Sequence, residues 1–178
     1  MQHNLNANLI RRLQKRLASP RLTTGFSMDK WLGGLARSST QTSLLPAEDA
    51  PHAHSCGTTA CIAGHVVLMI GSRIQVTRKL SDRMYQTVER RRYIFPGDRV
   101  EGVRYRTQLW SVESYAAKQL GLTSLQQSQL LRMTGDPTLP PGTNTWNLPQ
   151  LPSRKQAIIA LQNMIDRGEP RWGEVLNA

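Results

Sequence analysis

The stretch TTACIAGHVVLMIG, residues 58–71, is almost wholly apolar and decides the fold of this chain. Thr58 or Thr59 can serve as the N-cap of a helix, because a threonine hydroxyl accepts a hydrogen bond from a free backbone N–H of the first turn. Gly71 stands where a helix usually ends, since glycine adopts the left-handed conformation at low cost. A helix with so little polar surface is predicted to form the buried centre of the domain.

The residues before this stretch predict a basic amphipathic helix within residues 1–20. Its leucines recur at i, i+4 spacing while the basic residues fall mainly elsewhere around the turn, and Ser19-Pro20 ends it. The leucines are Leu5, Leu9, Leu13 and Leu17. Ser27 is expected to cap a short second helix that ends near Gly33-Gly34, and residues 38–55 are expected to form a loop rich in Ser, Thr and Pro.

Residues 111–168 predict a C-terminal part of three helices, each with a polar cap at its start and a glycine after its end. The caps are Ser111, then Thr123 with Gln126, then Ser153 with Gln156, and the glycines are Gly121, Gly135 and Gly168. Two of the caps have the spacing of a capping box, in which side chain and backbone bond reciprocally. A Pro-rich loop containing Trp146 separates the second helix from the third.

Residues 72–106 form an Arg-rich insertion between these helical parts. Its second half alternates around Pro96-Gly97-Asp98, which predicts a small β-hairpin over residues 93–106, and a helix over residues 77–92 is the alternative for the first half. The expected fold class is therefore mainly α, a compact single-domain helical bundle spanning residues 1–178 with this hairpin added. A chain of 178 residues buries a sizeable core without needing disulfides or metal.

Charge is the strongest global signal in the sequence. The formal net charge is +11 and the pI is about 10.6, so the protein attracts polyanions. The expected partner is nucleic acid, or else an acidic or nucleic-acid-binding protein. The sequence holds no apolar run of the roughly 20 residues that span a bilayer, so we expect no membrane association and a cytoplasmic location in a bacterial host cell.

The candidate binding residues are arginines and lysines, which contact phosphate and give little sequence specificity. Those of the insertion are Arg78, Lys79, Arg83, Arg90, Arg91, Arg92, Arg104 and Arg106, and those of the first helix are Arg11, Arg12, Lys15 and Arg16. Aromatic residues near the first group could stack on bases, namely Tyr85, Tyr93, Tyr105 and Trp110. A solvated charged surface is the plain alternative for such runs.

The two cysteines and three of the four histidines lie within residues 52–65. Cys61 and His65 are four residues apart, hence on one helix face, and Cys56 with His54 could complete a zinc site, although the spacing matches no common zinc finger. Alternatively, Cys56 near a helix N-terminus could be a reactive thiol paired with His54 or His65. Packing is favoured over both, so no catalytic residue, metal or cofactor is expected.

Three segments in order resemble a family of small bacterial and phage proteins. They are the stretch CGTTACIAG at residues 56–64, AKQLGLT at residues 117–123, and the last helix from Arg154 to Gly168. That family typically reads CGT-x-x-C-x-AG, then LGLT before a helix, then a loop with Trp. The resemblance implies a compact helical protein of phage or mobile-element type, and it implies no particular biochemical activity.

The chain departs from that family pattern at two places. Position 65 is His where an aromatic residue such as Trp is common, and the Arg-rich segment is longer than the usual connection. Both departures favour the arginines over the cysteines as the functional residues. We therefore expect a non-enzymatic protein whose basic surface binds nucleic acid or a nucleic-acid-handling complex. The alternative is an inhibitor or adaptor of anti-defence type that binds a host protein. DNA versus RNA and the oligomeric state stay open.

Overall fold

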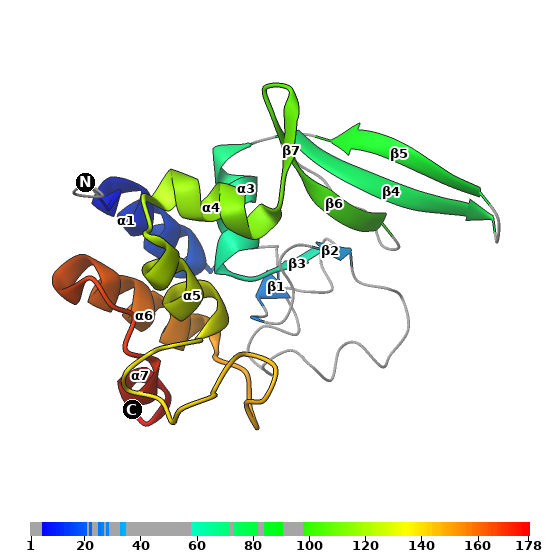
Figure 1. Cartoon of the computed structure of the whole chain (residues 1–178). Coiled ribbons are helices and arrows are strands. Elements are labelled where there is room, and N and C mark those ends of the chain that lie inside the picture. Colours follow the sequence, from blue (N-terminus) through cyan, green and yellow to red (C-terminus); the bar gives the residue numbers. More distant parts are fainter. Residues whose placement is uncertain are drawn as a thin grey trace.

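Six helices and two small sheets make up the described part of the chain (Figure 1). A computed structural model describes residues 5–20, 22, 25–26, 28, 33–34, 58–71, 73–81, 84–90 and 98–178. The helices are α1 (Ala7–Leu17), α3 (Ile62–Ile70), α4 (Val112–Leu120), α5 (Ser124–Arg132), α6 (Arg154–Arg167) and α7 (Trp172–Leu176). The strands are β1 (Gly25–Phe26), β2 (Gly33–Gly34), β3 (Thr58–Ala60), β4 (Arg73–Ser81), β5 (Met84–Arg90), β6 (Asp98–Tyr105) and β7 (Gln108–Trp110). Helical residues outnumber strand residues, which confirms the predicted mainly α fold.

Helix α3 is the buried centre that the apolar stretch predicts, and residues 62–67 are all buried. Its start differs from the prediction, because Thr58 and Thr59 lie in strand β3 and Cys61 is the N-cap. Strand β3 pairs with β1 on one side and β2 on the other, so its backbone groups are used in a sheet rather than in a first helical turn. The end is as predicted, with Gly71 in the left-handed conformation at φ 73°.

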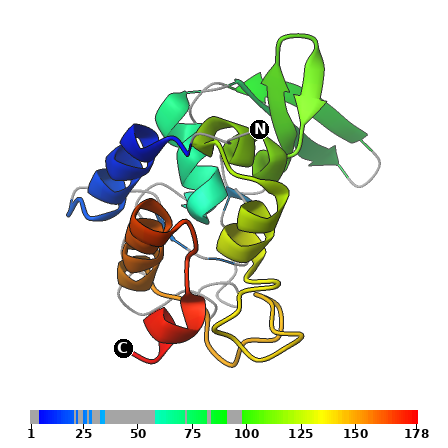
Figure 2. The ribbon, with the colours of Figure 1, turned by 60° about the vertical axis from the view of Figure 1, so that its left-hand side comes forward.

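Helix α1 packs its apolar face on the core, as its leucine spacing predicts. Leu9, Leu13 and Leu17 are buried, and α1 ends before Ser19-Pro20. The Asn6 side chain caps the helix by accepting a hydrogen bond from the Leu9 N–H at 3.1 Å. Helix α1 lies beside α6 and also contacts α3 and α4 (Figure 2), so it closes one side of the helical body.

The three predicted C-terminal helices are confirmed as α4, α5 and α6, and both predicted capping boxes are formed. Gly121 and Gly168 follow α4 and α6 in the left-handed conformation. Helix α5 ends earlier than its glycine suggests, because Met133 itself takes the left-handed C-cap conformation at φ 62°. Met133 is fully buried, so its packing holds a conformation that a non-glycine residue adopts at a cost.

Helix α7 was not predicted and is attached to the loop after α5. The backbone N–H of Trp172 donates to Asp136 Oδ2 at 2.8 Å, and the indole N–H donates to the Gln129 carbonyl at 3.0 Å. The N–H of Gly173 donates to Thr138 Oγ1 at 2.8 Å. Gly173 is required there, because a Cβ atom would collide with the backbone of Thr138. These contacts close the end of the helical body.

The described part of the Arg-rich insertion forms strands β4, β5 and β6, which make a four-stranded antiparallel sheet with β7 in the order β5-β4-β6-β7. The alternative of a helix over residues 77–92 is therefore wrong, because β4 and β5 satisfy their backbone groups by pairing with each other. A hairpin does occur, turning at Arg106-Thr107 and joining β6 to β7, whereas the predicted turn at Pro96-Gly97 lies outside the described residues. Strand β6 finds its other partner in β4, a pairing between distant residues that local alternation does not reveal.

Gly102 of β6 lies at a β-bulge between β4 and β7. The pairing of β6 with β4 shifts register there, so that Glu101 is an extra residue opposite Gln75 and Val76. A Cβ atom on Gly102 would collide with the carbonyl oxygen of Trp110, so glycine allows β7 to approach β6 closely at the bulge.

Two other predicted segments are only partly described. Gly33-Gly34, expected at the end of a short helix, forms strand β2, while Ser27 lies outside the described residues. The predicted loop at residues 38–55 also lies outside them, as do Tyr93 and Cys56. Among the helices described, none is both long and apolar enough to cross a lipid bilayer.

Candidate nucleic-acid interface

The polar face of helix α1 carries the first basic group. Arg11, Arg12 and Lys15 are exposed on the side opposite the buried leucines. Within the described residues no carboxylate forms an ion pair with any of the three. Their positive charge is therefore available to an anionic partner. The predicted fourth member, Arg16, is half-buried and its Nε donates to His65 Nδ1 at 3.5 Å, so it belongs partly to the core.

The second basic group lies where the β6–β7 hairpin meets helix α4, and we call it the cation–aromatic cluster. It consists of Tyr105, Arg106, Trp110 and Lys118. The Lys118 ammonium lies over the Trp110 ring, 4.6 Å from its centroid, and 5.3 Å from the centroid of Tyr105. The Arg106 guanidinium carbon lies 5.5 Å from the Tyr105 centroid on the same hairpin. The hairpin and the helix that follows it thus bring two cations onto two neighbouring rings.

The rings fix the position of these cations. Tyr105 packs against the buried Tyr115, with ring centroids 5.7 Å apart, and both Tyr105 and Trp110 rest on the hydrophobic core. A cation over an exposed aromatic face gains roughly 0.5–1 kcal/mol, enough to bias a flexible side chain toward one orientation. Lys118 also lies in the last turn of α4, where the helix dipole favours positive charge. The cluster therefore presents ordered positive charge at the surface.

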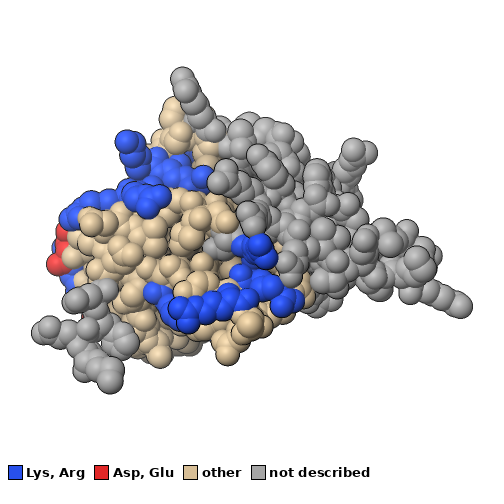
Figure 3. All heavy atoms as spheres, turned by 90° about the horizontal axis from the view of Figure 1, so that it is seen from above, with Lys and Arg blue, Asp and Glu red and all other residues tan. Residues whose placement is uncertain are grey.

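Two glutamates of the described part are already paired with arginines. Glu113 is buried and bonds Arg132 and Gln127. Glu174 pairs with Arg167 and Arg171 at the end of the helical body. Within the described residues, no ion pair involves a cation of the α1 face or of the cation–aromatic cluster. Viewed from above, the described lysines and arginines gather in two groups with uncharged surface between them (Figure 3).

The other predicted binding residues of the insertion lie outside the cation–aromatic cluster. Arg104 is half-buried and its Nη2 donates to Gln75 Oε1 at 2.7 Å, so it braces β6 against β4. The backbones of Arg78 and Lys79 lie in β4, and that of Arg90 lies at the end of β5. Arg83, Arg91 and Arg92 lie outside the described residues, as does Tyr93.

Sequence reasoning named Tyr105, Arg106 and Trp110 but missed Lys118. The signal was weak, because Lys118 is eight residues from Trp110 on a different element and only the packing of α4 against the hairpin unites them. A lysine in the last turn of a helix is too common to single out from sequence. The sequence also gave no sign that Arg104 serves the sheet.

The described part of the cysteine and histidine stretch is packed in the core. Cys61 is fully buried, and burial raises the pKa of its thiol to about 12. His65 is fully buried, and its ring stacks on Phe26 with centroids 6.0 Å apart. Among the described residues, no three His, Cys, Asp or Glu side chains come together as a metal site. Cys56 and His54, the other members of the zinc and thiol alternatives, lie outside the described residues.

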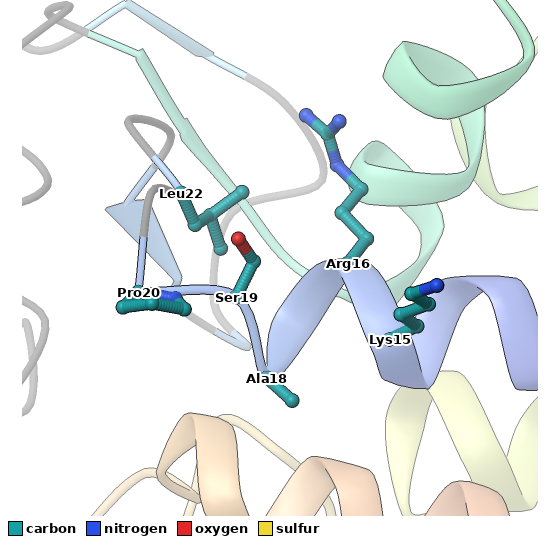
Figure 4. Close-up of a pocket in the computed structure, with 6 residues that line it drawn as sticks. All are labelled: Lys15, Arg16, Ala18, Ser19, Pro20 and Leu22. Atoms are coloured by element: carbon teal, nitrogen blue, oxygen red, sulfur yellow. The ribbon is translucent and has the colours of Figure 1, made fainter.

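A surface pocket of about 640 Å³ lies at the C-terminal end of α1 (Figure 4). Lys15, Arg16, Ala18, Ser19, Pro20 and Leu22 line it. The two cationic side chains diverge: Lys15 runs back along the helix, whereas Arg16 points toward α3. They therefore do not converge on one anion in the pocket, and the cation–aromatic cluster is the better-ordered basic site.

Comparison of the chain with protein-family models, with curated proteins and with solved structures gave no match. Its function is therefore argued from the residues and their geometry.

Proposed function

We propose that this protein binds nucleic acid by phosphate contacts and catalyses no reaction, acting in the bacterial cytoplasm as a phage or mobile-element protein. The observation that carries the proposal is the cation–aromatic cluster, in which packed rings hold Lys118 and Arg106 at the surface. The exposed cations of α1 add a second contact surface. The net charge of +11 supplies the long-range attraction.

The salt dependence of binding tests this proposal. We would measure binding of fluorescent DNA and RNA across a salt series for the wild type and for Arg106→Ala/Lys118→Ala. Each lost phosphate contact lowers the slope of log K against log salt by about 0.7–0.9, so the double variant should lose about 1.4–1.8. Affinity for all sequences should fall alike, because phosphate contacts carry no sequence information.

The matched control is Lys155→Ala/Arg167→Ala, which removes the same charge from exposed positions of α6. It should keep the wild-type slope within about 0.5, because its residues lie outside both proposed contact surfaces. Equal losses in both double variants would show a diffuse charge effect and contradict a defined site. Absence of binding to every nucleic acid at low salt would reject the function.

A second candidate function, binding of a host protein, is favoured by one observation. Trp146 is 68% exposed, and hydrogen bonds hold the loop that carries it. The Trp146 N–H donates to Asn144 Oδ1 at 2.9 Å, and Asn147 Nδ2 donates to the Gly142 carbonyl at 3.0 Å. An exposed aromatic on an ordered loop is typical of a protein interface anchor.

This candidate predicts a host protein that stays bound after nuclease treatment and is lost in Trp146→Ala. Arg106→Ala/Lys118→Ala is the comparison variant, because it should retain that partner while losing nucleic acid. If Trp146→Ala retains every partner of the wild type, this candidate is wrong.

A further inference from the structure

The start of helix α1 is bonded to the end of helix α4. The backbone N–H of Asn6 donates to the Leu120 carbonyl at 2.8 Å, and its side-chain Nδ2 donates to the Gln119 carbonyl at 3.2 Å. The Oδ1 atom of the same side chain accepts the N–H of Leu9 and so caps α1. Asn6 therefore fixes the N-terminus of α1 against the C-terminus of α4.

This junction brings the two basic groups close together. Lys118 of the cation–aromatic cluster lies two residues before Leu120, and Arg11 and Arg12 lie five and six residues after Asn6. A helix rises about 1.5 Å per residue, so the junction lies about 3 Å along α4 from Lys118 and about 8–9 Å along α1 from the two arginines. The backbone positions that carry the two groups are thus separated by on the order of 15 Å.

Both groups lie on one face of the molecule. The β6–β7 hairpin, α4 and α1 lie above α5 and α6 in Figure 1, and Figure 3 looks down on them. In that view uncharged atoms separate the two groups of lysines and arginines, and acidic atoms are visible only at one edge of the described surface. The only acidic residue of α1, β7 and α4 is Glu113, which is buried and paired with Arg132.

Polar side chains on this face are engaged within the protein. Both the Oδ1 and the Nδ2 atoms of Asn6 bond backbone groups at the junction. Beside the cluster, Ser111 Oγ accepts the N–H of Ser114 at 3.0 Å and donates to Ser114 Oγ at 2.8 Å. Base edges and the 2′-hydroxyl groups of RNA are recognised by hydrogen bonds. The face therefore offers its positive charge to phosphates rather than hydrogen bonds to bases or to 2′-hydroxyl groups.

The aromatic rings of the cluster are covered by its cations. Proteins that bind single strands stack successive bases on aromatic faces. Here Lys118 lies over both Trp110 and Tyr105, and Arg106 also lies over Tyr105. A base could stack on Trp110 only by displacing Lys118. A duplex keeps its bases inside and its phosphates outside, so it meets the ammonium where it lies.

We propose, as a step that rests on the proposed function, that both basic groups contact one DNA duplex, whose phosphate backbone crosses the α1–α4 junction. Each protein then binds one duplex. The second contact becomes intramolecular once the first is made, so the affinity exceeds that of either group alone. One strand advances about 3.4 Å per base pair, so a separation on the order of 15 Å corresponds to about four or five base pairs.

The first measurement is the stoichiometry of the wild type with a 12-base-pair DNA duplex in excess, by analytical ultracentrifugation. We expect one duplex per protein, and this measurement needs no variant to fold. Two duplexes per protein would show that the two groups are separate surfaces. That result would overturn this inference and leave the proposed function in place.

The second measurement is the affinity for the same duplex. Arg11→Ala/Arg12→Ala and Arg106→Ala/Lys118→Ala should each weaken binding about tenfold or more, because one duplex contacts both groups. The control Lys155→Ala/Arg167→Ala removes the same charge from exposed positions of α6 and should change the affinity less than threefold. Wild-type affinity in either of the first two variants would overturn the shared duplex.

The choice of ligand is tested with a 12-base-pair RNA duplex and a DNA single strand of 12 nucleotides. The wild type should bind the DNA duplex most tightly of the three. Equal or tighter binding of the RNA duplex or of the single strand would overturn duplex DNA as the ligand. Failure to bind any of the three would instead reject the proposed function itself.

Discussion

At the scale of single residues, the Cys61 thiol gives a prediction about pH. Its pKa is raised from 9.0 to about 12, chiefly by burial. The folded state therefore holds the thiol proton more tightly than the unfolded state does. The resulting stabilisation is complete below about pH 9 and is lost as the pH rises toward 12.

The measurement is the free energy of unfolding from pH 7.5 to pH 10.5 for the wild type and Cys61→Ala. The difference in stability between them should shrink at the alkaline end, because only the wild type loses this contribution. Cys56→Ala serves as the comparison for the other thiol. A difference that stays constant with pH would contradict the buried, protonated Cys61.

Single residues also show what local pattern can and cannot reveal. The exposed positions of Arg11, Arg12 and Lys15 followed from the helical period, because an apolar face on one side of a helix places them on the other. The roles of Arg104 and Lys118 did not, since each depends on a contact with a residue of another element. Spacing along the chain carries no information about such contacts.

At the scale of elements, the attachment of helix α7 depends on Asp136. Its carboxylate accepts hydrogen bonds from the backbone N–H of Trp172 at 2.8 Å and of Thr138 at 2.9 Å, and it is buried. Asp136→Ala should lower the free energy of unfolding by about 2–3 kcal/mol, since one buried and one partly buried donor lose a charged partner.

Urea unfolding measures this loss, and Asp166→Ala is the control because Asp166 is exposed on α6 and bonds only Gln162 among the described residues. The control should change stability by less than about 0.5 kcal/mol. A similar loss in both variants would mean that Asp136 is not the attachment point of α7.

Elements differ in how far they could be predicted. The starts of helices α4, α5 and α6 could be predicted from the N-caps Ser111, Thr123 and Ser153, because N-caps and capping boxes involve only residues close in sequence. Strands β4 and β5 did not, since a strand is stabilised by partners that may be distant in sequence. Helix α7 has five residues and depends on the loop after α5, so its own sequence carried little signal.

At the scale of the whole molecule, the sequence predicts what depends on local pattern or on composition, but not what depends on pairing between distant segments. The apolar stretch around His65 identified the buried centre, while the polyanionic partner that the charge indicates stays a prediction. The folding of the second basic segment into a four-stranded sheet could not be predicted. It arises from pairings such as Ile74 with Val103, which join segments that the sequence keeps apart.

The backbone of Arg106 has one more consequence. Its φ of 54° lies in the left-handed region, where an arginine costs about 1–2 kcal/mol and glycine costs little. Arg106→Gly should therefore raise the melting temperature by a few degrees while weakening DNA binding. Arg106 would then lower the thermal stability while placing a cation at the turn between β6 and β7. Calorimetry measures the change in melting temperature, and a binding titration measures the change in affinity. If Arg106→Gly neither raises the melting temperature nor weakens binding, no such trade-off exists.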